Sequence, residues 1–353
     1  MSKNHLVSIA IVGTGQIGPR HAEAVVEDPN SSLICFVDPN PAAEVVAKKF
    51  GVPLYPSVSA MLSSPHKPEA AIVCTPNHLH VEISKELLDA GVHVLCEKPI
   101  STDIKSGLSL VEHVKSSNAC LVIGHHRRLN KYVLAAKNTL PTLGRIITVS
   151  GMWCTSKPSS YFDPPTKWRR GTTGGPILIN LVHDVDVLQY LFGPIDHVYA
   201  EELPKERGHA AEEGAAIMIG FESGAIGTFI LCDNVPSPHN FESGTGENPI
   251  IPKTGMDVYR IFGSQGCLSV PDMKKWTYDR GKERSWTEML TEQEAEVPDV
   301  KIPFELQVEH FVKVIRGEEN PICSGEDGLR ALVVCDAVKK AIQAGGSRVT
   351  CRL

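Results

Sequence analysis

Apolar runs and amphipathic stretches alternate through residues 5–125. Five apolar runs have the character of buried strands, namely HLVSIAIVG, SLICFVD, EAAIVCT, VHVLCE and ACLVIG. Amphipathic segments such as PAAEVVAKKF and VEISKELLDAG lie between them and are typical of helices. Strands that alternate with helices pair in parallel, and runs rich in Val, Ile, Leu and Cys indicate a sheet buried on both faces. This half of the chain therefore predicts an α/β, doubly wound parallel sheet.

The pattern changes after about residue 126. KYVLAAKNTL predicts a helix, whereas RIITVSGMW and AAIMIGFESGAIGTFIL predict antiparallel strands, with ESG as a hairpin turn. Further helices are expected at residues 176–191 and in ELQVEHFVKVIRG and EDGLRALVVCDAVKKAIQAG. Residues 154–175 and 234–255 are long irregular stretches, which are usually functional or mobile. We predict two domains, 1–125 and 126–353, the second an α+β domain with a mostly antiparallel sheet.

Composition narrows the function classes. The 353 residues are 42% hydrophobic and 22% charged, and 41 acidic residues exceed 35 basic ones without any basic stripe. This distribution argues against nucleic acid as a partner. No apolar run approaches the roughly 18 residues of a membrane helix, and the N-terminus lacks a signal-peptide cleavage pattern. We expect no membrane partner and a cytoplasmic location.

The ten cysteines include no CxxC pair, and several lie in apolar runs, so we expect reduced core residues and no structural metal site. The chain ends Cys351-Arg352-Leu353, a loose relative of a peroxisomal address. The alternative is that RVTCRL forms a last edge strand. The peroxisomal address is the minor alternative to a cytoplasmic location.

A glycine loop follows the first expected strand and precedes a helix. Gly13, Gly15 and Gly18 satisfy GxGxxG, in which the first glycine permits a tight turn, the second a close approach to a pyrophosphate, and the third helix–strand packing. The helix N-terminus adds amide donors for phosphate, so Gln16 and Ile17 are also expected at the cofactor. The loop predicts a dinucleotide-binding Rossmann domain.

Asp38 ends the second expected strand, 20 residues beyond Gly18, where a ribose-binding acid belongs. A carboxylate there accepts the ribose hydroxyls and repels a 2′-phosphate, and no arginine follows in DPNPAAE. The sequence therefore favours NAD over NADP. The alternative for Asp38 is a turn-forming residue before Pro39.

Two more segments end expected parallel strands, at the edge where open α/β sheets bind ligands. Thr75, Pro76, Asn77 and His80 come after EAAIVC, and we expect them beside the cofactor; a metal role for the histidines is the alternative. LCEKPIS places Lys98 after another strand, with Pro99 holding it extended. Lys98 is either a surface lysine or a catalytic lysine held rigidly at the nicotinamide.

The motifs AIVGTGQIG, CTPNHLH, CEKP and GGPILINLVHDVDVLQYLFG, in this order and spacing, resemble those of the Gfo/Idh/MocA oxidoreductase family. That family includes glucose–fructose oxidoreductase and inositol dehydrogenase, and the resemblance spans nearly the whole chain. It implies a Rossmann domain joined to a domain with a large open sheet. It also implies reversible hydride transfer between a nicotinamide and a hydroxyl of a sugar, cyclitol or related polyol.

By this resemblance, Lys98 corresponds to the family's catalytic lysine and His183 to its catalytic histidine. Both would contact the substrate, and Glu97 would lie beside the cofactor and set the direction of Lys98. A lysine takes a proton near neutral pH only when burial or positive charge lowers its pKa. On a regular helix, Asn180, His183 and Asp184 would share one polar stripe facing a wet cleft.

One position departs from the family. Many members have an aspartate four residues before the histidine, where this chain has Ile179. Isoleucine relays no proton, so this chain departs from the usual Lys–Asp–His arrangement. Asn180 is then a candidate to bind a substrate hydroxyl, and Asp184 or water a candidate for the relay.

Further site residues are expected in the second domain and near its start. Trp168 and Arg169 resemble a family Trp–Arg pair near the nicotinamide, and HHRR supplies Arg127 or Arg128 on the cofactor side, with Arg127 our choice. Trp153 and Tyr161 are candidates to stack on a sugar ring.

Three function classes remain. The leading one is an NAD-dependent dehydrogenase of a polyol or sugar, assembled as a homodimer or homotetramer. A glycoside-cleaving enzyme that oxidises its substrate transiently is the second. A non-catalytic NAD sensor is the third, and the presence of both Lys98 and His183 counts against it.

Overall fold

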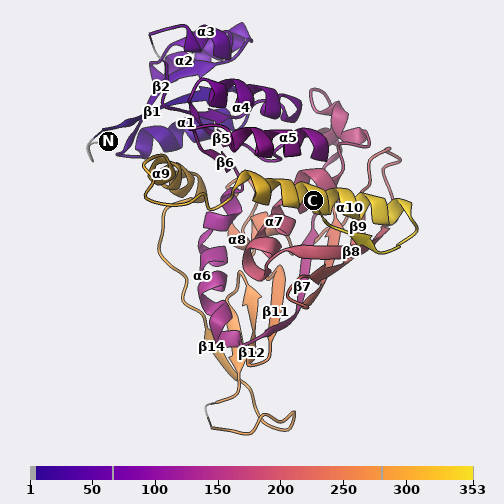
Figure 1. The fold of residues 1–353 in the computed structure, drawn as a ribbon. Helices are drawn as coiled ribbons and strands as arrows, with labels where there is room; N and C mark the ends of the chain where they lie inside the picture. The colour runs from indigo at the N-terminus through magenta and orange to yellow at the C-terminus, as the bar shows by residue number, and fades with distance from the viewer. Residues whose placement is uncertain (1–4, 66, 280, 353) are drawn as a thin grey trace. The chain divides into compact units, whose positions relative to one another are not determined.

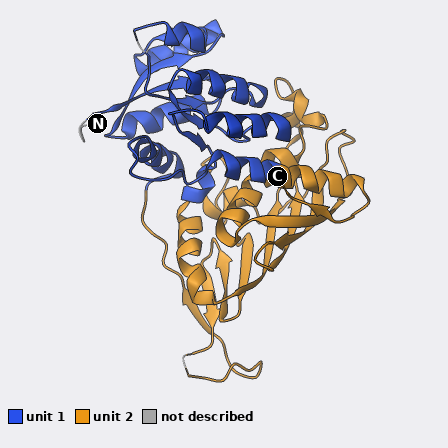
Figure 2. Ribbon diagram, in the orientation of Figure 1, with its two compact units in different colours: residues 1–129, 301–332 blue, residues 130–300, 333–353 orange. Residues whose placement is uncertain are grey.

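The computed structural model describes residues 5–65, 67–279 and 281–352. They divide into two compact units, residues 1–129 with 301–332 and residues 130–300 with 333–353 (Figure 2). The first unit thus extends slightly past residue 125. It also takes in residues 301–332, which the sequence analysis had assigned to the second domain. No pattern within that segment signals its return, because its partners are distant in the sequence.

The first unit contains a six-stranded parallel sheet, whose strands β1, β2, β5 and β6 are labelled in Figure 1. Its order is β3-β2-β1-β4-β5-β6, so the direction of winding reverses between β1 and β4. The strands are β1 (Val7–Val12), β2 (Ser31–Val37), β3 (Leu54–Tyr55), β4 (Ala70–Val73), β5 (His93–Cys96) and β6 (Leu121–Ile123). The five expected strands are confirmed. Such a reversal is where open α/β sheets bind ligands, beyond the carboxyl ends of the strands.

Helices pack on this sheet through a continuous apolar core. They are α1 (Gly18–Glu27), α2 (Glu44–Phe50), α3 (Val58–Leu62), α4 (His80–Asp89), α5 (Ile104–Val114) and α9 (Pro303–Ile315). Ile9 and Ile11 of β1, Phe36 of β2 and Val25 of α1 are fully buried in one cluster with Phe311 of α9. Each such side chain contributes roughly 1.5–3 kcal/mol on burial, which explains why α9 belongs to this unit.

The second unit contains a nine-stranded sheet of order β14-β13-β12-β11-β7-β10-β9-β8-β15. All its pairs are antiparallel except β7 with β10, which confirms the mostly antiparallel prediction. The strands are β7 (Ile146–Cys154), β8 (Ile195–Glu202), β9 (Gly214–Phe221), β10 (Ile226–Cys232), β11 (Tyr259–Gly263), β12 (Gly266–Val270), β13 (Lys274–Thr277), β14 (Thr291–Glu294) and β15 (Val349–Thr350). Gly224 makes the β9–β10 turn at φ 84°, as ESG predicted.

One face of this sheet is buried and the other exposed. In β10 the side chains of Phe229 and Leu231 are fully buried, whereas Ile226 and Ile230 are 43% and 40% exposed. The helices of the unit are α6 (Lys131–Thr139), α7 (Val182–Phe192), α8 (Phe241–Thr245) and the later turns of α10 (Gly325–Gln343). The sheet therefore presents a partly apolar surface.

The chain's end forms the short edge strand β15 against β8. The tripeptide Cys351-Arg352-Leu353 ends outside the described residues, at Leu353. Within the described chain, no helix is long and apolar enough to cross a membrane.

Candidate functional site

The glycine loop has the geometry that a pyrophosphate requires. Gly13 has φ 99°, and a Cβ there would lie 2.8 Å from the Cys74 carbonyl carbon. A Cβ on Gly18 would lie 2.1 Å from the Gly13 oxygen, whereas a Cβ on Gly15 would meet nothing within 4 Å. Gly13 and Gly18 are therefore required by packing, and Gly15 leaves an open approach to the backbone.

Helix α1 begins at this loop, and its second residue is Pro19, which has no amide hydrogen. Its N-cap residue, Ile17, makes no side-chain hydrogen bond to the helix, and Gln16 beside it is exposed. The first amides of a helix have no partner within the helix, and the helix dipole favours an anion there. Gln16, Ile17 and Gly18 thus lie where a phosphate group would bind.

Asp38 follows β2 and is joined to the glycine loop. One carboxylate oxygen accepts hydrogen bonds from the Thr14 amide and hydroxyl, at 2.9 and 2.8 Å. The other accepts from the Asn40 amide at 2.9 Å. These bonds fix a half-exposed carboxylate at the edge of the sheet, where it can accept bonds from two neighbouring hydroxyls.

The segment after β4 contains the next group of residues expected beside the cofactor. Pro76 and Asn77 are exposed, and the Thr75 hydroxyl is buried without a hydrogen-bond partner among the described residues. His80 is turned inward, and the cofactor contact expected for it stays a prediction. It is 1% exposed, and both ring nitrogens face backbone carbonyls, of Pro99 and Thr75.

Glu97 and Lys98 follow β5 and differ in their surroundings. Glu97 is buried, with Oε1 2.8 Å from His21 Nε2 and Oε2 accepting from the Lys98 amide at 3.1 Å. Burial raises the pKa of Glu97, but the hydrogen bond from His21 and the charges of His21, His126 and Lys98 outweigh it and bring this pKa to about 2. Lys98 is half-buried. Glu97 thus holds the lysine segment from inside, and the position beside the cofactor expected for it stays a prediction.

The HHRR segment follows β6 and is also turned inward. Arg127 and Arg128 are 2% and 4% exposed. Arg128 donates to the Ile322 carbonyl at 2.6 Å and lies 3.7 Å from Asp327, so it binds the returning C-terminal segment. The cofactor role expected for Arg127 stays a prediction.

In the second unit, the helix that carries His183 does not begin as a regular α-helix. Ile177–Leu181 (η7) form a π-helical turn, and α7 begins at Val182. The polar stripe expected from 3.6-residue spacing is therefore broken at Asn180. His183 is buried, and Asp184 is fully buried and accepts a hydrogen bond from Tyr259 at 2.5 Å. Asp184 lies in the core rather than along a wet cleft. Extra turns of this kind occur frequently at functional sites.

Lys157 is a lysine beside Asn180 that the sequence alone does not single out. Its ammonium donates to Asn180 Oδ1 at 2.8 Å and lies 3.2 Å from Asp233. Burial lowers the pKa of Lys157, and Asp233 opposes this. Its partners are 23 and 76 residues away in the sequence, so no local pattern could have revealed them.

The aromatic residues expected at the substrate separate into two groups. Trp153 is 3% exposed and donates from Nε1 to Glu242 at 2.7 Å, so it is not available to stack on a sugar. Tyr161 is half-buried, with the Arg169 guanidinium 3.8 Å and the Lys157 ammonium 4.6 Å from its ring centre. Trp168 is 52% exposed. The cofactor roles of Trp168 and Arg169 stay predictions.

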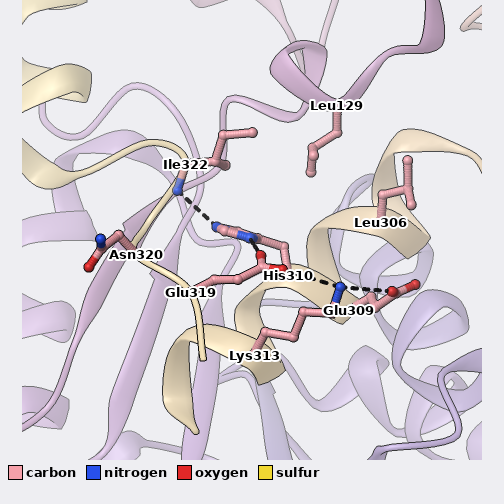
Figure 3. Close-up of a pocket in the computed structure, with 8 residues that line it drawn as sticks. All are labelled: Leu129, Leu306, Glu309, His310, Lys313, Glu319, Asn320 and Ile322. Carbon is pink, nitrogen blue, oxygen red and sulfur yellow. Dashed lines mark hydrogen bonds and ion pairs between the residues drawn. The ribbon is translucent and has the colours of Figure 1, made fainter. Parts of the chain in front are cut away.

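A separate cavity of about 400 Å³ opens in the first unit between Leu129, α9 and residues 319–322 (Figure 3). Its charged groups already pair with one another. Lys313 lies 3.2 Å from Glu309 and 3.3 Å from Glu319, and His310 bonds Glu319 at 2.6 Å. We assign no ligand to it. Among the described residues, no cluster of His, Cys, Asp and Glu could hold a metal ion.

The first unit is a dinucleotide-binding Rossmann domain by its strand order and its glycine loop. Comparison with known families agrees with this. The model of the oxidoreductase family with an NAD-binding Rossmann fold matches residues 7–125, and that of the family's C-terminal alpha/beta domain matches residues 141–350. The chain belongs to the Gfo/Idh/MocA family and is an NAD(P)-dependent oxidoreductase by family.

Its relatives are distant. Myo-inositol 2-dehydrogenase of Thermotoga maritima is 24% identical over 95% of this chain and 96% of its own length. The 2,7-anhydro-N-acetylneuraminate hydratase of Mediterraneibacter gnavus is 26% identical over 60% of this chain and 54% of its own. The WlbA dehydrogenase of Bordetella pertussis, solved with NADH and UDP-GlcNAcA, is 22% identical over 99% of this chain and 100% of its own, with a TM-score of 0.77. At this identity the solved structure shows a shared fold.

Proposed function

We propose that this protein is an NAD-dependent dehydrogenase that oxidises a hydroxyl of a sugar, cyclitol or related polyol reversibly. The observation that carries the proposal is that the expected cofactor-binding residues and Lys98 lie at the same edge of the parallel sheet. The glycine loop, Asp38 and Lys98 follow the carboxyl ends of β1, β2 and β5 in one parallel sheet. Lys98, the proposed acid–base group, thus lies at the same edge of the sheet as the proposed dinucleotide-binding residues.

The cradle supports NAD as the cofactor. The open backbone at Gly15 and the N-terminus of α1 would hold the pyrophosphate, and the Asp38 carboxylate would accept the ribose hydroxyls. A 2′-phosphate would place negative charge against that carboxylate, which Thr14 and Asn40 hold in position. NAD, when bound, supplies the hydride acceptor.

Lys98 is the proposed acid–base group. It would hold the reacting hydroxyl and help to take its proton, since a lysine without its proton is a competent base. The buried Glu97 carboxylate accepts a hydrogen bond from the Lys98 amide and so fixes the lysine backbone. His183, which the second unit carries, is the proposed second acid–base group. Asn180, held by Lys157, is a proposed contact for a substrate hydroxyl.

A second reaction class has specific support. One relative is named a hydratase rather than a dehydrogenase, so relatives of this chain include one whose name denotes no net redox change. Transient oxidation of a glycoside, elimination of its leaving group and re-reduction would use the same residues. NADH would then not accumulate.

A substrate panel tests the proposal. The purified protein with NAD is mixed with individual sugars, inositols, sugar acids and glycosides, and NADH is followed by absorbance while products are followed by chromatography. We expect NADH formation with at least one polyol. Product formation without NADH would favour the cleaving reaction, and neither signal across the panel would contradict the proposal.

A further inference from the structure

Two buried histidines flank the Glu97-Lys98-Pro99 segment. His21 lies on α1 and is fully buried; His80 is the first residue of α4 and is 1% exposed. Each binds a different side of the segment, His21 through the Glu97 side chain and His80 through the Pro99 carbonyl. All these groups belong to the first unit.

The bonds of His80 define its protonation. Nδ1 lies 2.8 Å from the Pro99 carbonyl oxygen and Nε2 lies 2.9 Å from the Thr75 carbonyl oxygen. A carbonyl oxygen only accepts hydrogen bonds, so both contacts are hydrogen bonds only when both nitrogens carry a proton. A neutral ring would leave one nitrogen lone pair facing an oxygen lone pair in the interior. This geometry favours the imidazolium form.

The electrostatic surroundings agree with this geometry. Burial, the largest influence, lowers the pKa of His80. Interactions with the Cys96 side chain and with the Pro99 and Thr75 carbonyls outweigh burial and raise this pKa to about 9. Cys96 and the two backbone acceptors together thus favour the charged form of this buried ring at neutral pH.

His21 holds the other side. Its Nε2 donates to Glu97 Oε1 at 2.8 Å, and Glu97 Oε2 accepts the Lys98 amide at 3.1 Å. The His21 ring packs edge-on against Phe304 of α9 at 5.0 Å between ring centres, so it has little freedom to move. The chain of contacts runs from α1 through one carboxylate to the lysine backbone.

We propose that His21 and His80 are positioning residues that clamp the Lys98 backbone from both sides and tie it to the two cofactor loops. His21 makes the link to α1, which begins at Gly18 of the glycine loop. His80 makes the link to Thr75, which follows β4. The expected effect of the clamp on turnover rests on the proposed function. The protonation of His80 and the contacts of both histidines do not depend on that function.

The clamp matters because displacement of a reacting group by about 1 Å can reduce turnover roughly 100-fold. Without the imidazolium, two buried carbonyls lose their donors and the Pro99 backbone is free to shift. Without the His21 donor, the buried Oε1 of Glu97 loses its hydrogen bond. Neither loss removes a contact to the phosphates or the ribose, so NAD affinity should be preserved.

The first test reads protonation directly. The protein is labelled with ¹⁵N-histidine, and the ring nitrogens are recorded by NMR at pH 8, with His80 assigned by the signal that is missing in His80→Gln. We expect both His80 nitrogens to be protonated. A neutral tautomer at pH 8 would overturn the inference, whatever the enzyme's substrate.

The second test separates positioning from folding. We expect His80→Gln and His21→Leu to lower kcat by about 10- to 100-fold. NAD Kd, from titration, should stay within roughly threefold. His21→Gln keeps an amide donor for Glu97 and should recover most of the kcat lost in His21→Leu. His113→Gln, on α5 and bonded to Asp89, is the matched control and should change nothing.

Unchanged kcat in both His80→Gln and His21→Leu would contradict the clamp, as would an equal loss in His21→Gln and His21→Leu. If no substrate is found, the ¹³Cε signal of Lys98 replaces kcat as the readout. It should move in the two disruptive variants and not in His113→Gln, and an unmoved signal would overturn the inference. Absence of turnover in the unmodified protein bears on the proposed function alone.

Discussion

The hydroxyl and amide of Thr14 both donate to the same carboxylate oxygen of Asp38, at 2.8 and 2.9 Å. These bonds join the glycine loop to the end of β2, so the loop proposed to bind the phosphates also fixes the carboxylate proposed to select the cofactor. Thr14 lies 24 positions before Asp38 in the chain, and the parallel pairing of β1 with β2 brings them together.

Cofactor choice follows from this contact. We expect NAD to bind more tightly than NADP, and Asp38→Ala to narrow that difference by weakening NAD and relieving the repulsion of a 2′-phosphate. Fluorescence titration with both cofactors measures it. Asp89→Ala, at the end of α4, is a control that should leave both affinities unchanged. Equal affinities in the unmodified protein would remove the role given to Asp38.

Substitution by alanine should affect stability at one glycine of the loop and NAD binding at another. A Cβ on Gly18 would collide with the Gly13 oxygen, so Gly18→Ala should lower the free energy of unfolding by about 1–3 kcal/mol. A Cβ on Gly15 meets no protein atom, so Gly15→Ala should fold normally but bind NAD at least tenfold more weakly. Denaturant unfolding and NAD titration of both variants check this. Normal NAD affinity in Gly15→Ala would show that nothing approaches this backbone.

These loops also show what the sequence could and could not predict. The five strands, the glycine loop and Asp38 depend on neighbours within one βαβ segment, so local patterns were sufficient. The return of α9 to the first unit depends on Phe311 meeting residues nearly 300 positions away. The π-helical turn before His183, the burial of Asp184 and the Lys157–Asn180 bond likewise depend on packing between distant segments. The inward orientation of Glu97 and His80 could not be predicted, because a motif gives the order of residues along the chain and not the direction of their side chains.

Stability should depend on pH through His80. Its pKa is raised from 6.5 to about 9 in the folded protein, so its contribution is fully present below pH 6.5 and is lost as the pH rises through 9. The loss is on the order of 3 kcal/mol. Denaturant unfolding between pH 6 and 9.5 should therefore show that the unmodified protein has a higher free energy of unfolding than His80→Gln at low pH, and that this difference disappears as the pH rises. A difference independent of pH would contradict the buried charge.

Glu97 should act at the acid end. Its pKa is lowered from 4.5 to about 2, so its stabilising contribution is present above pH 4.5 and is lost as the pH falls through 2. Glu97→Gln should remove this part of the acid sensitivity. Acid titration of the near-ultraviolet circular dichroism of both proteins measures the shift, and coincident curves would argue against an ionised, buried Glu97.

The exposed face of the second sheet predicts self-association. Met218, Ile226 and Ile230 are each about 40% exposed on neighbouring strands, and apolar groups gathered on one face mark an interaction surface. We expect a homodimer or homotetramer, and Ile230→Lys should shift it toward monomer in light scattering. Ile250→Lys, on a loop, is the control. A monomer at micromolar concentration in the unmodified protein would contradict this prediction.

The central claim is that Lys98 performs acid–base chemistry beside a nicotinamide. Lys98→Ala should reduce turnover on the best substrate by about two to four powers of ten, the usual contribution of one positioned proton-transfer group. NAD Kd should change little, because Gly15, α1 and Asp38 make the expected cofactor contacts. Lys105→Ala, an exposed lysine on α5, should retain full turnover. The deciding measurement is kcat of Lys98→Ala with NAD Kd titrated separately: a large loss of kcat at unchanged Kd is the predicted result, and retained turnover would contradict the account.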